Sequence, residues 1–271
     1  MKRLEKKFKE LKAKKQCAFV AYICAGHPNY ETSLEVLEAL PKAGADIIEL
    51  GVPFLDPSGD GPIIENASKL AIANGMSLKK TLEMAATFRK NNSETPLILM
   101  SYYNPILKYG LNKIFTDAEK SGIDGILIVD LPLEEQAEIL SEISRSNLDL
   151  INLIAPTTDQ NRAKKIVKNS GGFLYLISML GITGTTLADV SENKKNLESL
   201  REVSDLPTVI GFGIQTPEQA SEFAKSGADG VVIGSVIVKD IDNNFANKKS
   251  RDEIIASLTK LVENFSKKIK S

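Results

Sequence analysis

Lys42-Ala-Gly-Ala-Asp46 leads into the apolar run Ile47-Ile-Glu-Leu50, and the same kind of junction occurs twice more. The other copies are Lys120-Ser-Gly-Ile-Asp124 and Lys225-Ser-Gly-Ala-Asp229, and each of them also precedes an apolar run. Lysine is favourable in the last turn of a helix, glycine takes the left-handed position that ends it, and aspartate begins the turn into a strand. A helix-to-strand junction used three times predicts a repeated strand–helix unit.

Eight short apolar runs have the length of strands that cross one sheet, and most of them are continuous rather than alternating. Continuous runs are typical of parallel strands that are covered on both faces. The eight runs are Ala18–Cys24, Asp46–Leu50, Leu97–Met100, Gly125–Val129, Leu148–Ile154, Phe173–Leu176, Thr208–Gly211 and Gly230–Ile233. Segments with helical periodicity lie between them, as in Tyr30–Lys42, Leu78–Lys90, Leu133–Ser146 and Pro217–Ser226.

These units predict an α/β protein with a single domain over residues 1–271, folded as a (β/α)8 TIM barrel. The alternative, an open doubly wound sheet, usually has a glycine-rich fingerprint after its first strand. Here the first run is followed by Ala25-Gly-His-Pro28, which lacks that fingerprint. Beyond the minimal barrel we expect an N-terminal helix over 2–14, two helices over 62–90 broken near Asn74-Gly75, and a final helix over 248–269.

Composition excludes several classes of protein. The chain has 271 residues, of which 42% are hydrophobic and 25% charged, and its net charge is −1, so neither nucleic acid nor a membrane surface is the expected partner. Cys17 and Cys24 are too few for a disulfide framework, and the single histidine, His27, predicts no metal site. Because no stretch reads as a signal peptide, we expect a soluble, cytoplasmic protein.

Three carboxylates lie at the end of the second predicted strand or on the loop after it. Glu49 lies at its end, and Asp56 and Asp60 lie on the loop after it. Functional groups of barrels gather at the carboxyl ends of the strands, where a buried carboxylate and a second one nearby form an acid–base pair. The structural alternatives are a Glu49 bonded to a neighbouring amide and an Asp60 that only serves a turn.

The loops after the seventh and eighth predicted strands are rich in glycine. Gly211-Phe-Gly213 and Gly234-Ser235 allow backbone amides to approach an anion, and a helix beginning at Ser235 would direct its positive end to the same place. Phosphate commonly binds to these two loops of a barrel. Tight turns are the alternative explanation for the glycines.

An ordered set of motifs resembles the tryptophan synthase α subunit family. The set comprises Glu49-Leu-Gly-Val-Pro-Phe54, Asp60-Gly-Pro62, Tyr103-Asn-Pro105, Asp130-Leu-Pro132, Gly181-Ile-Thr-Gly184, Gly211-Phe-Gly-Ile214 and Gly234-Ser235. The resemblance implies a lyase of tryptophan biosynthesis that cleaves indole-3-glycerol phosphate to indole and glyceraldehyde 3-phosphate by a retro-aldol reaction. The chain departs from the usual family residues at Cys24, His27, Leu55 and Met179.

The resemblance also implies roles for individual residues. Glu49 is similar to the family's proton-shuttling residue, and Asp60 to the residue that accepts a hydrogen bond from the indole N–H. Thr183 would steady the side chain of the substrate or Asp60, and the segments 53–60 and 179–187 would form lids. The implied phosphate contacts are Gly184, Gly213, Gly234 and Ser235, and the implied walls around the indole are Tyr22, Leu127, Tyr175 and Phe212.

Finally, the resemblance implies a partner, the β subunit of an α2β2 heterotetramer, to which indole passes directly. Asp56, Asn104 and Pro132 are similar to docking residues, and the pyridoxal phosphate would belong to the partner, with no cofactor in this chain. One alternative is a weakly active α-type subunit that mainly activates the β subunit allosterically. Another is a different sugar-phosphate isomerase or aldolase, which would need a lysine or a second aspartate at a strand end.

Overall fold

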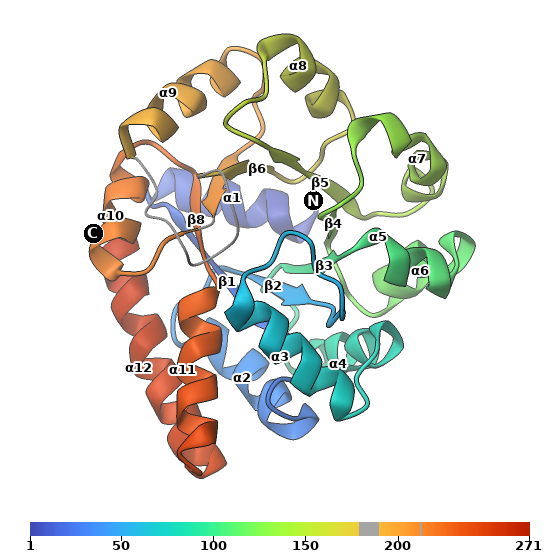
Figure 1. Cartoon of the computed structure of the whole chain (residues 1–271). Coiled ribbons are helices and arrows are strands. Elements are labelled where there is room, and N and C mark those ends of the chain that lie inside the picture. The colour runs from blue at the N-terminus through green and yellow to red at the C-terminus, as the bar shows by residue number, and fades with distance from the viewer. Residues whose placement is uncertain (179–189, 212) are drawn as a thin grey trace.

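The computed structural model describes residues 1–178, 190–211 and 213–271, and within them eight parallel strands close into a barrel in chain order (Figure 1). The strands are β1 (Ala18–Cys24), β2 (Ile47–Gly51), β3 (Leu97–Ser101), β4 (Gly125–Ile128), β5 (Asp149–Ile154), β6 (Leu174–Ile177), β7 (Thr208–Gly211) and β8 (Gly230–Ile233). β1 pairs with both β2 and β8, which closes the ring. All eight predicted strands are confirmed, with ends that differ by no more than one residue.

Helices surround the strands (Figure 1). They are α1 (Arg3–Ala13), α2 (Tyr30–Lys42), α3 (Pro62–Ala73), α4 (Leu78–Asn91), α5 (Tyr103–Tyr109), α6 (Leu111–Lys120), α7 (Ala137–Ile143), α8 (Gln160–Lys168), α9 (Val190–Arg201), α10 (Pro217–Lys225), α11 (Ser235–Ala246) and α12 (Arg251–Ile269), with a 3-10 turn at Leu133–Glu135. The two helices expected over 62–90 are α3 and α4, and the break between them includes Asn74 and Gly75 as predicted. The TIM-barrel prediction is therefore confirmed, and the assignment of residues 1–271 to one domain stays a prediction.

The N-terminal helix α1 covers the end of the barrel where the strands begin. Its apolar residues Leu4, Phe8 and Leu11 are buried, and the Phe8 ring lies 5.9 Å from the ring of Phe173, just before β6. Arg3 on the same helix bonds Asp124 at the start of β4, at 2.8 Å. The expected closure of this end is therefore supported by both apolar packing and ion pairs.

The repeated junction stabilises the same end of the barrel. Its glycines all adopt positive φ angles, as a helix-ending glycine does, and they are Gly44, Gly122 and Gly227. Each aspartate accepts a hydrogen bond from the first amides of a neighbouring strand, in the pairs Asp46 with Phe19, Asp124 with Leu97 and Asp229 with Thr208. The motif thus joins adjacent strands at their amino ends, and it leaves their carboxyl ends to the loops that build the site.

Candidate active site

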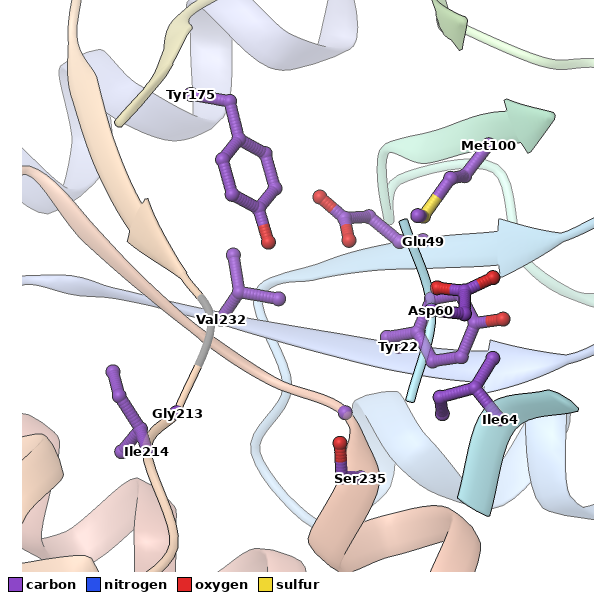
Figure 2. A pocket seen from close by; sticks show the side chains of 11 residues that line it. Tyr22, Glu49, Asp60, Ile64, Met100, Tyr175, Gly213, Ile214, Val232 and Ser235 are labelled. Carbon is purple, nitrogen blue, oxygen red and sulfur yellow. The ribbon is translucent and has the colours of Figure 1, made fainter. Parts of the chain in front are cut away.

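A cavity with about 450 Å³ of empty space lies within the barrel mouth (Figure 2). Its lining residues come from six of the eight strands or from the segments that follow them, and they are Tyr22, Glu49, Asp60, Ile64, Met100, Tyr175, Gly213, Ile214, Val232, Gly234 and Ser235. Both predicted acids and three predicted phosphate contacts therefore share one cavity.

Glu49 is the third residue of β2, and its side chain points inward, into the cavity (Figure 2). The residue is 1% exposed, and its Oε1 atom has no hydrogen-bond partner among the described residues. Burial disfavours the charged form and raises the pKa of the carboxyl to about 8 from its ordinary value of 4.5. Glu49 therefore carries a proton through most of the neutral range, and it has a free oxygen to direct at a ligand.

Asp60 lies on the loop after β2, two residues before α3 begins, and it is held by Tyr102. The Tyr102 hydroxyl donates to Asp60 Oδ2 at 3.0 Å and accepts from the Gly59 amide at 3.1 Å. The ring of Tyr102 lies 5.4 Å from that of Phe54, on the same loop. Burial raises the pKa of Asp60 to about 6, and the hydrogen bond from Tyr102 opposes that rise. Above pH 6 Asp60 is thus mainly a carboxylate, in contrast to Glu49.

Tyr102 has a part in the site that sequence reasoning missed. The bond that it makes to Asp60 spans 42 residues and leaves no local pattern in the sequence.

Two glycines at strand ends make room for the two tyrosine rings of the cavity. A Cβ atom on Gly51 would lie 2.4 Å from the Tyr22 hydroxyl, and one on Gly211 would lie 2.0 Å from the Tyr175 hydroxyl. Any side chain at either position would displace the ring beside it. Sequence analysis assigned no such role to Gly51 or Gly211. The signal that could have indicated this role is a glycine at the end of a mainly apolar strand, because such a glycine often marks a close approach by a neighbouring group.

The other side of the cavity is made of bare backbone. Gly213 has a φ angle of 77°, which favours glycine, and Gly234 is the N-cap of α11. Because Gly234 has no side chain to accept from the first turn, the amides that begin α11 stay open to a ligand. Ser235 starts the helix within the cavity, as Figure 2 shows. Such a helix start favours a phosphate group.

The remaining sequence-predicted residues lie in three places. Leu127 is buried in β4 opposite Met100 and is not among the residues that line the cavity. Thr183, Gly184, Phe212 and the expected lid 179–187 lie outside the described residues. The three predicted docking residues are exposed on the segments after β2, β3 and β4, and they are Asp56, Asn104 and Pro132.

Comparison with known proteins identifies the family. Residues 8–270 match the sequence family described as Tryptophan synthase alpha chain. The chain belongs to the tryptophan synthase alpha chain family. The resemblance seen in the motifs is therefore confirmed over nearly the whole chain. The family's reaction is the cleavage of indole-3-glycerol phosphate, which makes the chain a lyase of tryptophan biosynthesis, and the family has no cofactor of its own.

Solved structures agree with this assignment. The chain is similar to the tryptophan synthase subunit alpha of Legionella pneumophila str. Paris, with 34% identity over 99% of this chain and 98% of that one and a TM-score of 0.91. It is similar to a protein of Aquifex aeolicus VF5, with 37% identity over the full length of both chains and a TM-score of 0.89. It also resembles a chain of Mycobacterium tuberculosis tryptophan synthase, with 29% identity over 100% and 99% of the two chains and a TM-score of 0.88.

Two kinds of feature are absent from the described residues. No group of three or more histidine, cysteine, aspartate or glutamate side chains there is arranged to hold a metal ion. In the same part of the chain, no helix combines the length and the apolar character needed to span a membrane.

Proposed function

We propose that Glu49 and Asp60 together cleave indole-3-glycerol phosphate in this cavity, with its phosphate held by Gly213, Gly234 and Ser235. The observation that carries the proposal is a buried acid, with an oxygen that has no partner among the described residues, that shares one cavity with a second acid and with the open amides of a helix start. The substrate offers a matching group for each: an indole ring, a side-chain hydroxyl and a phosphate.

The bond that breaks joins indole C3 to the adjacent carbon of the side chain. Glu49 begins in its protonated form, which its raised pKa favours, and gives that proton to C3. The ring then accepts the electron pair of the breaking bond. The hydroxyl on the side-chain carbon loses its proton to the Glu49 carboxylate and becomes the aldehyde of glyceraldehyde 3-phosphate. One proton is given and one is taken, so Glu49 ends as it began.

Asp60 stabilises the charge that develops on the ring. When C3 gains a proton, positive charge appears at the indole nitrogen. This charge strengthens the hydrogen bond that the indole N–H donates to a carboxylate. Asp60 is suited to this part because its pKa of about 6 leaves it ionised while Glu49 is still protonated. Tyr102 fixes its Oδ2 atom, which leaves Oδ1 for the substrate.

The chain acts with a β subunit, and we place the docking surface on the segments after β2, β3 and β4. There the expected residues Asp56, Asn104 and Pro132 are accompanied by two large apolar side chains that are more than half exposed, Leu55 at 59% and Leu107 at 53%. Charged, polar and apolar groups together are typical of a protein interface. An α2β2 assembly, direct passage of indole and pyridoxal phosphate in the partner belong to this proposal, as does a cytoplasmic location.

The test compares Glu49→Gln and Asp60→Asn with the unmodified chain. Both variants should lose indole formation by at least about a hundredfold, the lower end of general acid–base contributions, and should still bind indolepropanol phosphate. Asp56→Asn is the matched control, since Asp56 is exposed on the same loop and the isolated chain should cleave normally without it. Near-normal cleavage by Glu49→Gln contradicts the assignment. Assays with and without the β subunit test the activator alternative, which appreciable stimulated cleavage rules out.

A further inference from the structure

The turn after β1 carries a partly buried hydrogen bond between two side chains that the reaction does not use. His27 Nε2 lies 2.6 Å from Oδ1 of Asp242 on α11, with the side chains 1% and 37% exposed. The ring nitrogen donates, because a carboxylate oxygen can only accept. His27 is the chain's single histidine, and it does not line the cavity.

Asp242 lies on the helix that begins at the proposed phosphate site. It follows Ser235 by seven residues, which is two helical turns, so both side chains leave α11 on the same face. α11 packs against β1 and α3, and Figure 1 shows α11 beside α3. A link between His27 and Asp242 therefore fixes the position of α11 along its axis and its tilt. These two quantities decide where the first amides of α11 lie in the cavity.

The same turn holds the helix that follows Asp60. Asn74, the residue that ends α3, donates from its Nδ2 to the Pro28 carbonyl at 2.8 Å. Ile64 in the first turn of α3 lines the cavity, and Asp60 precedes that helix by two residues. β1 itself contributes Tyr22. One turn thus bonds to the two helices whose first residues form the acid side and the phosphate side of the cavity.

We propose that His27 and Asp242 form a positioning pair that aligns the α11 amides with the phosphate of the substrate, a role that rests on the proposed function of those amides. The pair touches neither the ring nor the reacting bond. Its loss should therefore weaken binding of the phosphate-bearing partner of the reaction and leave binding of indole unchanged.

The reverse reaction separates these two effects, because it joins indole to glyceraldehyde 3-phosphate. Asp242→Ala should raise the KM for glyceraldehyde 3-phosphate about tenfold, equivalent to about 1.4 kcal/mol, with the KM for indole within about twofold of the unmodified chain. Alanine favours helix, so α11 itself should stay folded. Asp242→Asn keeps an acceptor for the His27 N–H and should restore most of the affinity.

Two controls test the alternative of a merely structural pair. Asn243→Ala changes the exposed neighbour on the same helix, and Glu35→Ala breaks another 2.6 Å ion pair, that with Arg251. Neither should alter either KM. An unchanged KM for glyceraldehyde 3-phosphate in Asp242→Ala, or an equal rise in both KM values, overturns the positioning role. Failure of the proposed function is distinguishable, since it shows itself separately as near-normal cleavage by Glu49→Gln.

Discussion

Replacing Glu49 with glutamine should abolish cleavage and at the same time make the protein more stable above pH 5. The carboxyl is buried and has a pKa of about 8 in the folded chain, against 4.5 when it is exposed to water. Between these two values the folded state retains a proton that the unfolded state has released. Stability must then fall as pH rises through this window, by about 1.4 kcal/mol for each pH unit.

The magnitude follows from the same two numbers. In the unfolded chain the pKa of Glu49 is 4.5, so pH 7 lies 2.5 units above it. In the folded chain pH 7 still lies below the pKa of about 8. Glu49 therefore lowers the free energy of unfolding at pH 7 by about 3 kcal/mol relative to acidic solution. Since protein domains are stable by only about 5–15 kcal/mol, that cost is large. Glutamine has nearly the same shape and does not ionise. It should recover most of this free energy at pH 7 and nearly none at pH 4.5.

Urea unfolding at pH 5, 6, 7 and 8 measures the effect, with the free energy of unfolding of each variant compared at each pH. The difference between Glu49→Gln and the unmodified chain isolates this residue, because Asp60 and the other groups titrate in both proteins. We expect the difference to grow by about 1 kcal/mol per unit between pH 5 and pH 8. A difference that stays constant over that range refutes the raised pKa and, with it, the reading of Glu49 as a proton donor at neutral pH.

Three further outcomes are expected. The pH profile of kcat/KM for cleavage should be bell-shaped with limbs near 6 and 8, because it needs Asp60 ionised and Glu49 protonated; a flat profile between pH 5 and 9 would contradict both assignments. Gly51→Ala should displace the Tyr22 ring and raise the KM for indole in the reverse reaction at least fivefold, and an unchanged KM would contradict that role of Gly51. Leu107→Asp should weaken stimulation by a β subunit about tenfold or more in a titration, with cleavage by the isolated chain unaltered; equal stimulation would place the docking surface elsewhere.

The strands were predictable because their signal is local. A parallel strand covered on both faces is a continuous apolar run, and a helix that ends in Lys-x-Gly-x-Asp marks where the next run starts. The structure adds α5, which sequence analysis did not identify: it occupies only seven residues and ends at Gly110, where φ is 106°. A helix of two turns shows too little periodicity to separate it from a loop.

The candidate site also has a part that the sequence predicts and a part that it does not. Glu49 and Asp60 were predictable because carboxyl ends of parallel strands meet at one face, so position along each strand was enough. The contacts that support them were not, since they join residues far apart in the chain. No local pattern pairs His27 with its partner, because Asp242 lies 215 positions away. Only the closure of β8 onto β1 brings these two residues together.

Two acids on one short segment have different roles, one in stabilising the fold and the other in the reaction. Asp46, just before β2, is nearly buried, but its Oδ2 accepts from the Phe19 amide and it pairs with Lys270 at 2.9 Å. Glu49, three residues later and in the middle of β2, has an oxygen with no partner among the described residues. A buried carboxylate whose oxygens are bonded supports the fold, whereas burial without such bonds keeps Glu49 protonated and makes it destabilising. The lack of a partner makes Glu49 costly to bury, and it also leaves the Glu49 proton available to the substrate. A mutation that places a hydrogen-bonding side chain beside Glu49 should therefore restore stability only by removing activity.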